Sequence, residues 1–129
     1  MAAGHEALHG TWSLEAYEDR DAPAREWTRT YGRARGIIAY DPTGALSVVI
    51  TAGPGATDEG WGLAYVGRFE VASWNEHDGV VEGVVLHHME GASDPSLFDD
   101  GPERIFRLEG DTLEIGDDIT YRRRFRRAT

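Results

Sequence analysis

The sequence predicts an all-β fold, an eight-stranded antiparallel up-and-down β-barrel. Apolar and polar residues alternate in about eight short runs, which is the period-two pattern of strands with one buried face. Turn sequences that contain Pro or Gly separate several of these runs. The links between the runs are alternately long and short, as expected for strands that run up and down around a closed barrel.

The expected strands follow one another along the chain. The first has one face made of Trp12, Leu14 and Ala16 and another made of Ser13, Glu15 and Tyr17. The other seven span residues 35–40, 45–51, 65–71, 80–90, 104–109, 112–115 and 119–126. The turn sequences Asp41-Pro42-Thr43-Gly44 and Gly110-Asp111 join two pairs of them as hairpins. No long segment has a convincing helical period.

The lengths of the links place a binding site at one end of the barrel. The links after the first, third and fifth strands are long and span residues 18–34, 52–64 and 91–103. Those after the second, fourth and sixth strands are tight turns. Because odd-numbered links share one end of an up-and-down barrel, we expect an open end with three long loops, where binding residues usually lie. The short link Gly116-Asp117-Asp118 belongs to the same end.

Composition restricts the location and the partners of the protein. The 129 residues include no cysteine and carry a formal net charge of −10, which disfavours nucleic acid and anionic membranes because phosphate contacts need basic surface. Without a signal-peptide pattern or a run of about 18 apolar residues, we expect one soluble cytoplasmic domain, residues 1–129. Arginines cluster at positions 122–124, 126 and 127, but Tyr121 and Phe125 alternate among them and predict a strand rather than a basic tail.

An ordered set of short segments extends over most of the chain. It comprises Gly10-Thr11-Trp12, residues 36–44, residues 65–71, residues 87–91 and residues 104–113. Together these segments resemble the lipocalin-like domain family of the calycin group. The resemblance implies a barrel around a mainly apolar lumen, with the first long link acting as a lid. Some similar small barrels act as cyclases or isomerases in natural-product pathways.

The alternation decides which side chains face the lumen. On strand 80–90, if the charged Glu82 faces solvent, the alternation places His87 and Met89 inside the barrel. A shift of one residue would exchange His87 with His88. On strand 104–109, Arg104 faces inward together with Phe106 and Leu108. Tyr65 and Tyr121 begin strands at the same open end. Three aromatic residues lie on the loops above it, Trp27, Tyr31 and Trp61.

These residues form the expected ligand site, made of Trp27, Tyr31, Trp61, Tyr65, His87, Met89, Arg104, Phe106 and Tyr121. An apolar lumen with one imidazole, one guanidinium and phenols suits a small, largely hydrophobic molecule. Its carboxylate, enolate or carbonyl oxygen would contact Arg104. Small-molecule binding in the lumen is therefore the first functional hypothesis.

Two alternatives stay open. The protein is a cofactor-independent cyclase, isomerase or dehydratase that acts on a polyketide-like or terpenoid-like substrate; His87 would then be the general acid or base, with a pKa lowered toward neutrality, and Arg104 or Tyr65 would stabilise an oxyanion. Or it is an interaction module with a filled barrel, which forms a homodimer through the outer residues Val84 and Leu86. If these residues stabilise the fold and have no other role, His87 belongs to the core and Arg104 pairs with a carboxylate at the rim.

We expect neither a metal nor a cofactor. His87 and His88 are adjacent on a strand and point to opposite faces, so both cannot bind one ion. The acidic residues Asp94, Asp99, Asp100 and Glu103 lack the spacing of a calcium loop and are interpreted as a solvated loop. We expect Trp12 to fill the closed end with an arginine of the last strand stacked on it, and Tyr40 to be a core residue near that end.

Overall fold

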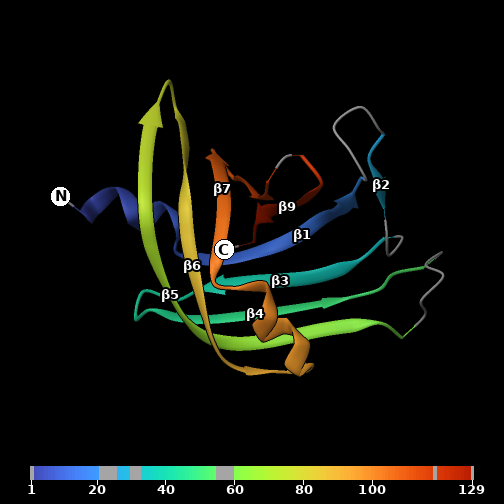
Figure 1. Cartoon of the computed structure of the whole chain (residues 1–129). Coiled ribbons are helices and arrows are strands. Elements are labelled where there is room, and N and C mark those ends of the chain that lie inside the picture. Colours follow the sequence, from blue (N-terminus) through green and yellow to red (C-terminus); the bar gives the residue numbers. More distant parts are fainter. Residues whose placement is uncertain (1, 21–25, 30–32, 55–59, 118, 129) are drawn as a thin grey trace.

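The computed structural model describes residues 2–20, 26–29, 33–54, 60–117 and 119–128, which form a closed antiparallel barrel of eight strands (Figure 1). The barrel strands are β1 (Gly10–Asp19), β3 (Arg35–Tyr40), β4 (Ala45–Thr51), β5 (Gly62–His77), β6 (Val80–Ala92), β7 (Glu103–Glu109), β8 (Thr112–Gly116) and β9 (Tyr121–Arg127). Each pairs with the next, and β9 pairs with β1 to close the barrel. The all-β, up-and-down fold expected from the sequence is confirmed.

Three short elements accompany the barrel. Strand β2 (Thr28–Arg29) pairs with the end of β1, and two 3-10 helices, η1 (Ala2–Leu8) and η2 (Pro95–Asp100), lie before β1 and between β6 and β7. None of the three was expected from the sequence. They are too short to show a period in the sequence. Asp94 caps the start of η2, because its side chain accepts a hydrogen bond from the Ser96 N–H.

The observed strand boundaries agree best with those expected from the sequence where a tight turn determines them. Strands β3 and β4 have the expected limits, because Asp41-Pro42-Thr43-Gly44 closes their hairpin through the Gly44 N–H and the Asp41 carbonyl. Strands β5 and β6 extend further than expected and form a long ribbon whose register shifts twice, between Val66 and Gly67 and between Val71 and Ser73. Such irregularities increase the local twist of a strand pair.

Strand β9 begins two residues later than expected because Asp117 holds the chain in a turn. Its Oδ1 atom accepts hydrogen bonds from the backbone N–H groups of Ile119, Thr120 and Tyr121 at 2.8, 2.7 and 3.0 Å. Burial acts to raise the pKa of this carboxyl group, but these bonds and the Thr120 hydroxyl outweigh it and hold the pKa well below its ordinary value. The carboxylate is thus part of the β8–β9 connection.

A bulge in β1 reverses one expectation about its faces. The register with β9 moves from Leu14 opposite Phe125 to Ala16 opposite Arg124, so Glu15 is the additional residue. Beyond this point the inward positions change parity, and Tyr17 and Asp19 line the interior. The expected outward position of Tyr17 is therefore wrong, since strict alternation cannot anticipate a bulge.

The closed end has the expected plug. Trp12 is fully buried, and its indole N–H donates to the Leu8 carbonyl at 2.9 Å, so that η1 covers the ring. The Arg127 guanidinium lies 4.2 Å from the centre of the same ring. Stacking by an arginine of the last strand, predicted from the sequence, is confirmed.

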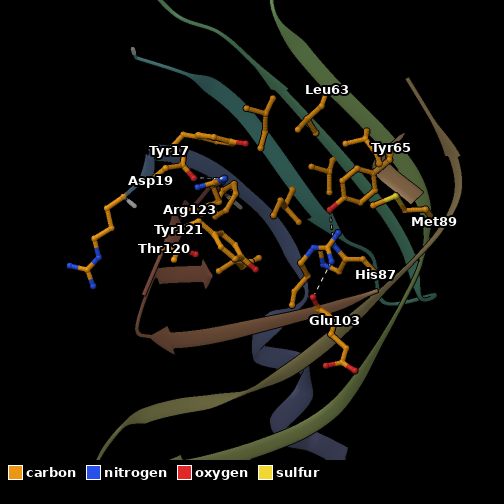
Figure 2. Close-up of a pocket in the computed structure, with 18 residues that line it drawn as sticks. Tyr17, Asp19, Leu63, Tyr65, His87, Met89, Glu103, Thr120, Tyr121 and Arg123 are labelled. Atoms are coloured by element: carbon orange, nitrogen blue, oxygen red, sulfur yellow. Dashed lines mark hydrogen bonds and ion pairs between the residues drawn. The ribbon is translucent and has the colours of Figure 1, made fainter. Parts of the chain in front are cut away.

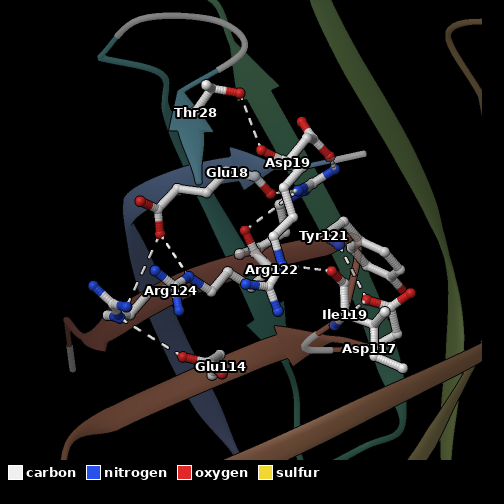
Figure 3. A network of polar contacts seen from close by, with 11 residues as sticks. Glu18, Asp19, Thr28, Glu114, Asp117, Ile119, Tyr121, Arg122 and Arg124 are labelled. Atoms are coloured by element: carbon white, nitrogen blue, oxygen red, sulfur yellow. Dashed lines mark hydrogen bonds and ion pairs between the residues drawn. The ribbon is translucent and has the colours of Figure 1, made fainter. Parts of the chain in front are cut away.

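The arginine cluster divides between the two faces of β9, and its outward members form an ion-pair network at the seam with β1 (Figure 3). Glu18 Oε1 lies 2.8 Å from Arg122 Nε and 4.0 Å from Arg124 Nη2. Arg124 Nε also lies 3.8 Å from Glu114 on β8. These ion pairs link β9 to β1 and β8, its two neighbours in the barrel, and the arginine cluster is a strand rather than a tail.

Gly67 provides a test of the close contact between β5 and β6. A Cβ atom on this residue would lie 2.0 Å from the His88 carbonyl oxygen, so Gly67→Ala must move the backbone of β6. We expect it to lower the free energy of unfolding by about 1–3 kcal/mol in urea denaturation. Gly91→Ala is the matched control, since its Cβ would meet only the Val66 side chain, at 3.5 Å, and we expect little change. Equal losses in the two variants would contradict this explanation.

Within the described ranges, no helix is both long and apolar enough to cross a membrane.

Candidate functional site

The lumen contains a half-enclosed cavity of about 580 Å³ (Figure 2). Its apolar wall comes from six barrel strands, β3 to β6, β8 and β9, and from η2, and consists of Ile38, Val48, Ile50, Leu63, Met89, Leu97, Ile115 and Phe125. Its polar lining consists of Tyr17, Asp19, Arg20, Tyr65, His87, Glu103, Arg104, Thr120, Tyr121 and Arg123. The interaction-module hypothesis required a barrel filled by side chains, whereas this barrel contains a cavity. The cavity volume falls within the range of about 300–1,000 Å³ that is typical of small-molecule sites.

The cavity lies at the end that the link lengths predicted. Residues beside the long links line it, with Arg20 following β1, Ile50 near the end of β4 and Leu97 within the β6–β7 link. Thr120 represents the short β8–β9 connection that was assigned to the same end.

His87 is the buried centre of the polar lining, and its side chain is only 2 % exposed. Its two ring nitrogens contact two phenols, with Nδ1 2.8 Å from the Tyr65 hydroxyl and Nε2 2.7 Å from the Tyr40 hydroxyl. His88 faces solvent next to Glu70. The structure thus resolves the alternative between the two histidines in favour of His87.

Burial lowers the pKa of His87 to about 3, and the positive charges of Arg104 and His88 add to this effect. The sequence suggested that the pKa of His87 is lowered toward neutrality. In the structure the pKa lies far lower than that. The imidazole is therefore neutral at physiological pH and has one N–H donor and one acceptor nitrogen. Burial and the nearby Tyr65 raise the pKa of Tyr40 well above its ordinary value against the opposing effect of Arg104, so this phenol stays protonated.

Arg104 is a cavity cation that donates hydrogen bonds to neutral backbone carbonyls. Its Nη1 atom donates to the backbone carbonyls of Gly101 and Glu103 at 2.8 and 3.0 Å. Among the described residues, no carboxylate oxygen lies within 4.0 Å of the Arg104 guanidinium. The ion pair with a rim carboxylate that the sequence suggested is therefore not formed among them. Its partner in the register of β6 and β7 is Val85, two residues before His87 on the same strand face, and its charge lowers the pKa of both His87 and Tyr40.

Arg123 is a second cavity cation that the sequence interpretation did not include. It is neutralised, because Nη2 lies 3.2 Å from Asp19 Oδ1 and the guanidinium stacks on Tyr17 at 3.4 Å from the ring centre. Its inward parity follows from Tyr121 and Phe125, so the alternation could have identified it. The role of Tyr17 and Asp19 could not be found in this way, since the β1 bulge brings them inside.

Five of the expected ligand residues line the cavity, namely Tyr65, His87, Met89, Arg104 and Tyr121. Phe106 is a core residue that packs on Trp74 with ring centres 5.7 Å apart, because its inward position lies nearer the closed end. Trp61 packs edge-on against Tyr17, with ring centres 5.8 Å apart. Tyr31 lies outside the described residues.

Trp27 is not among the residues that line the cavity. The guanidinium groups of Arg20, which lines the cavity, and Arg122 lie 4.1 and 4.2 Å from the centre of its ring. The pairing of Thr28 and Arg29 with the end of β1 holds this segment beside that strand. The lid expected for the first link falls partly outside the described residues.

Tyr40 is the core residue that the sequence predicted, but its contact with His87 was not foreseen. The two residues are 47 positions apart, and only the curvature and stagger of the closed barrel bring them together across the lumen. No local pattern in the sequence indicates this contact.

The described residues contain no group of three or more His, Cys, Asp or Glu side chains that could hold a metal ion. Comparison with protein-family models, with curated proteins and with solved structures finds no match for this chain.

Proposed function

We propose that the protein binds a small, largely hydrophobic organic molecule in the lumen of its barrel, as the resemblance to lipocalin-like domains implies. The observation that carries this proposal is the half-enclosed cavity of about 580 Å³ with its apolar wall. Ligand sites of this kind combine mostly apolar walls with a few polar groups that orient the ligand. Here the polar groups include Tyr65, His87 and Arg104 on β5, β6 and β7, and a second set on or beside β1 and β9.

Arg104 supports a ligand with an oxygen-bearing head group. A guanidinium without a carboxylate partner in a half-buried site gains most from an anionic or strongly polar oxygen. Arg123, which Asp19 neutralises, has less to gain from a second anion. We therefore place the head of the ligand near Arg104 and its apolar body against the wall formed by β3, β4 and β5.

A second candidate is a cofactor-independent cyclase, isomerase or dehydratase acting on a polyketide-like or terpenoid-like substrate in the same lumen. The contact between the cavity-lining Tyr65 hydroxyl and His87 favours it, since a phenol beside a cation can stabilise an enolate oxygen. With His87 neutral, Tyr65 and Arg104 would be the groups that contact the reacting oxygen. Replacement of Tyr65 by Phe would then reduce turnover far more than binding.

Blocking the lumen tests the binding function. We expect the full chain to bind 1-anilinonaphthalene-8-sulfonate, an apolar probe with one anionic group, in a fluorescence titration. Ile50→Trp adds bulk at a buried cavity position and should weaken binding at least about tenfold. Val49→Trp is the matched control, because Val49 is the neighbouring residue of β4 on the outer face and is 44 % exposed.

Val49→Trp should bind within about twofold of the wild type, an affinity change of under half a kilocalorie per mole. Near-UV circular dichroism must show that both variants keep native packing, since this dye also binds loosely packed proteins. Equal affinities of the two variants would show that the probe binds elsewhere, and lumenal binding would then be rejected.

A further inference from the structure

We propose that the protein forms a homodimer through the outer face of β1, β3, β4 and β5, about a two-fold axis that crosses these strands. The strands are neighbours in the barrel wall, in the order β1-β3-β4-β5 (Figure 1). The proposal concerns the outside of the barrel and does not depend on what the lumen binds.

Two rows of uncharged residues cross this face, with one residue of each strand in each row. The first row is Ser13, Ile37, Val49 and Ala64, and the second is Thr11, Ala39, Ser47 and Val66. Both rows point outward, because the residues between them on each strand are buried. Ile37, Val49 and Val66 are 40, 44 and 53 % exposed. In a chain with 28 % charged residues, we call these two uncharged rows the uncharged face.

The sizes of the outward residues select the axis. Each of β3, β4 and β5 has one large and one small residue on the uncharged face, namely Ile37 and Ala39, Val49 and Ser47, and Val66 and Ala64. A two-fold axis that crosses the strands midway between the rows places each row of one copy over the other row of the second copy. Every large apolar side chain then lies over a small residue, which allows close packing of the two faces.

The charges at the two ends of β3 complement each other about the same axis. Arg35 begins the strand and Asp41 follows its last residue, so the midpoint between them is Ile38, which lies between the two rows. The axis therefore places Arg35 of one copy beside Asp41 of the other, and this pair occurs twice. Among the described residues Arg35 forms no ion pair, whereas Arg68, which also borders the face, already donates to the Thr43 carbonyl at 2.9 Å.

A second outer apolar patch is less suited to a homodimer. Val84, one of the two residues from which the sequence suggested a dimer, pairs with Ile105, which is 52 % exposed. The other, Leu86, lies between Glu70 on β5 and Glu103 on β7. Two copies that met here would bring acidic side chains of both chains to one interface, and like charges oppose association.

The size of the uncharged face predicts a weak dimer. Four strands spaced about 4.8 Å apart, with seven residues each from Arg35 to Asp41, span about 19 by 23 Å. This is roughly 440 Å² in plan, and side chains that stand above the sheet add to it. Two copies would bury roughly 1,000 Å² in total, which is typical of transient rather than obligate complexes.

The oligomeric state of the full chain tests the proposal. We expect sedimentation velocity between about 1 μM and 1 mM to show a reversible dimer with a Kd on the order of 100 μM. Val49→Glu puts a charge in the middle of the uncharged face and should weaken dimerisation at least about tenfold. Ile105→Glu makes the same change of charge on the other patch and should keep the Kd within about twofold. Circular dichroism checks that both variants are folded.

Two outcomes of this experiment would overturn the proposal. A monomer over the whole concentration range would show that the uncharged face does not bind a second copy. Equal Kd values of the two variants would show that any dimer forms elsewhere.

Cysteine cross-linking tests the axis, because the sequence contains no cysteine of its own. Ala45 and Thr51 are exposed at the two ends of β4, about 20 Å apart. The axis brings Ala45 of one copy beside Thr51 of the other. A mixture of Ala45→Cys and Thr51→Cys chains should therefore form a disulfide-linked dimer at least about tenfold faster than either variant alone. Faster linkage of Ala45→Cys with itself would overturn the axis and the pairing of Arg35 with Asp41.

Discussion

Trp12→Ala should lower the free energy of unfolding by about 3–5 kcal/mol, the range for removing a fully buried large aromatic side chain. The loss has three physical sources at the closed end. The variant leaves a cavity where the indole was, removes the hydrogen bond to the Leu8 carbonyl, and takes away the surface on which Arg127 stacks. Urea denaturation followed by far-UV circular dichroism measures the change.

A control for this prediction uses Trp27, an indole that is stacked by arginines but lies outside the core. Trp27→Ala removes the contacts with Arg20 and Arg122 and leaves the buried cluster intact, so we expect a loss of about 1 kcal/mol or less. Trp12→Phe should lie between the two, because it keeps part of the packing. A Trp12→Ala loss no larger than that of Trp27→Ala would contradict the assignment of Trp12 as the plug of the barrel.

Acid should destabilise the protein through His87 before its carboxylates take effect. The pKa of His87 is about 3 in the folded state, whereas the ordinary value is 6.5. Between these two values the unfolded state binds one proton more than the folded state, so stability falls as the pH falls below 6.5. The steepest slope from this residue is about 1.4 kcal/mol per pH unit, which amounts to roughly 3 kcal/mol between pH 6.5 and pH 4.

The pH range of this measurement separates His87 from the acidic side chains with lowered pKa. Asp41, Asp94 and Asp117 have ordinary values of 3.8, so the stability that they contribute is lost mainly below that pH. Urea denaturation between pH 7 and pH 4 should therefore show the effect of His87.

His87→Gln should flatten this dependence even if it is less stable at pH 7. His88→Gln changes the neighbouring solvent-facing residue and should keep the slope of the wild type. If the stability of His87→Gln fell as steeply as that of the wild type, a buried neutral imidazole would not explain the acid sensitivity.

A neutral His87 changes what the candidate site does. The sequence suggested an imidazole that exchanges protons near neutral pH, whereas the structure places it between two phenols in a desolvated position. In the proposed binding function, Arg104 rather than His87 would then be the charged group that contacts a ligand. This arrangement suits recognition of an acceptor oxygen, and in the enzyme hypothesis it suits stabilisation of an oxyanion.

The fold and the position of the site were largely readable from the chain. Alternation and turn residues are local properties, so they predicted strands β3 and β4 to the residue, the inward face of His87 and Arg104, and the end of the barrel that carries the cavity. The expected stacking of an arginine of the last strand on Trp12 is also confirmed, although this contact joins distant segments of the chain. Alternation failed where one strand departs from regular geometry, at the β1 bulge that brings Tyr17 and Asp19 inside.

By itself, the sequence determined the barrel and the parity of most side chains, because both depend on the order of residues within a strand or a turn. Apart from the contact of Trp12 with an arginine of the last strand, only the tertiary structure decided which inward side chains meet. It brought Tyr40 to His87 across 47 residues, assigned Phe106 to the core rather than the cavity, and stacked Trp27 with Arg20 and Arg122. These contacts depend on the stagger and curvature of a closed sheet, which combine all eight strands and have no signature within any one of them.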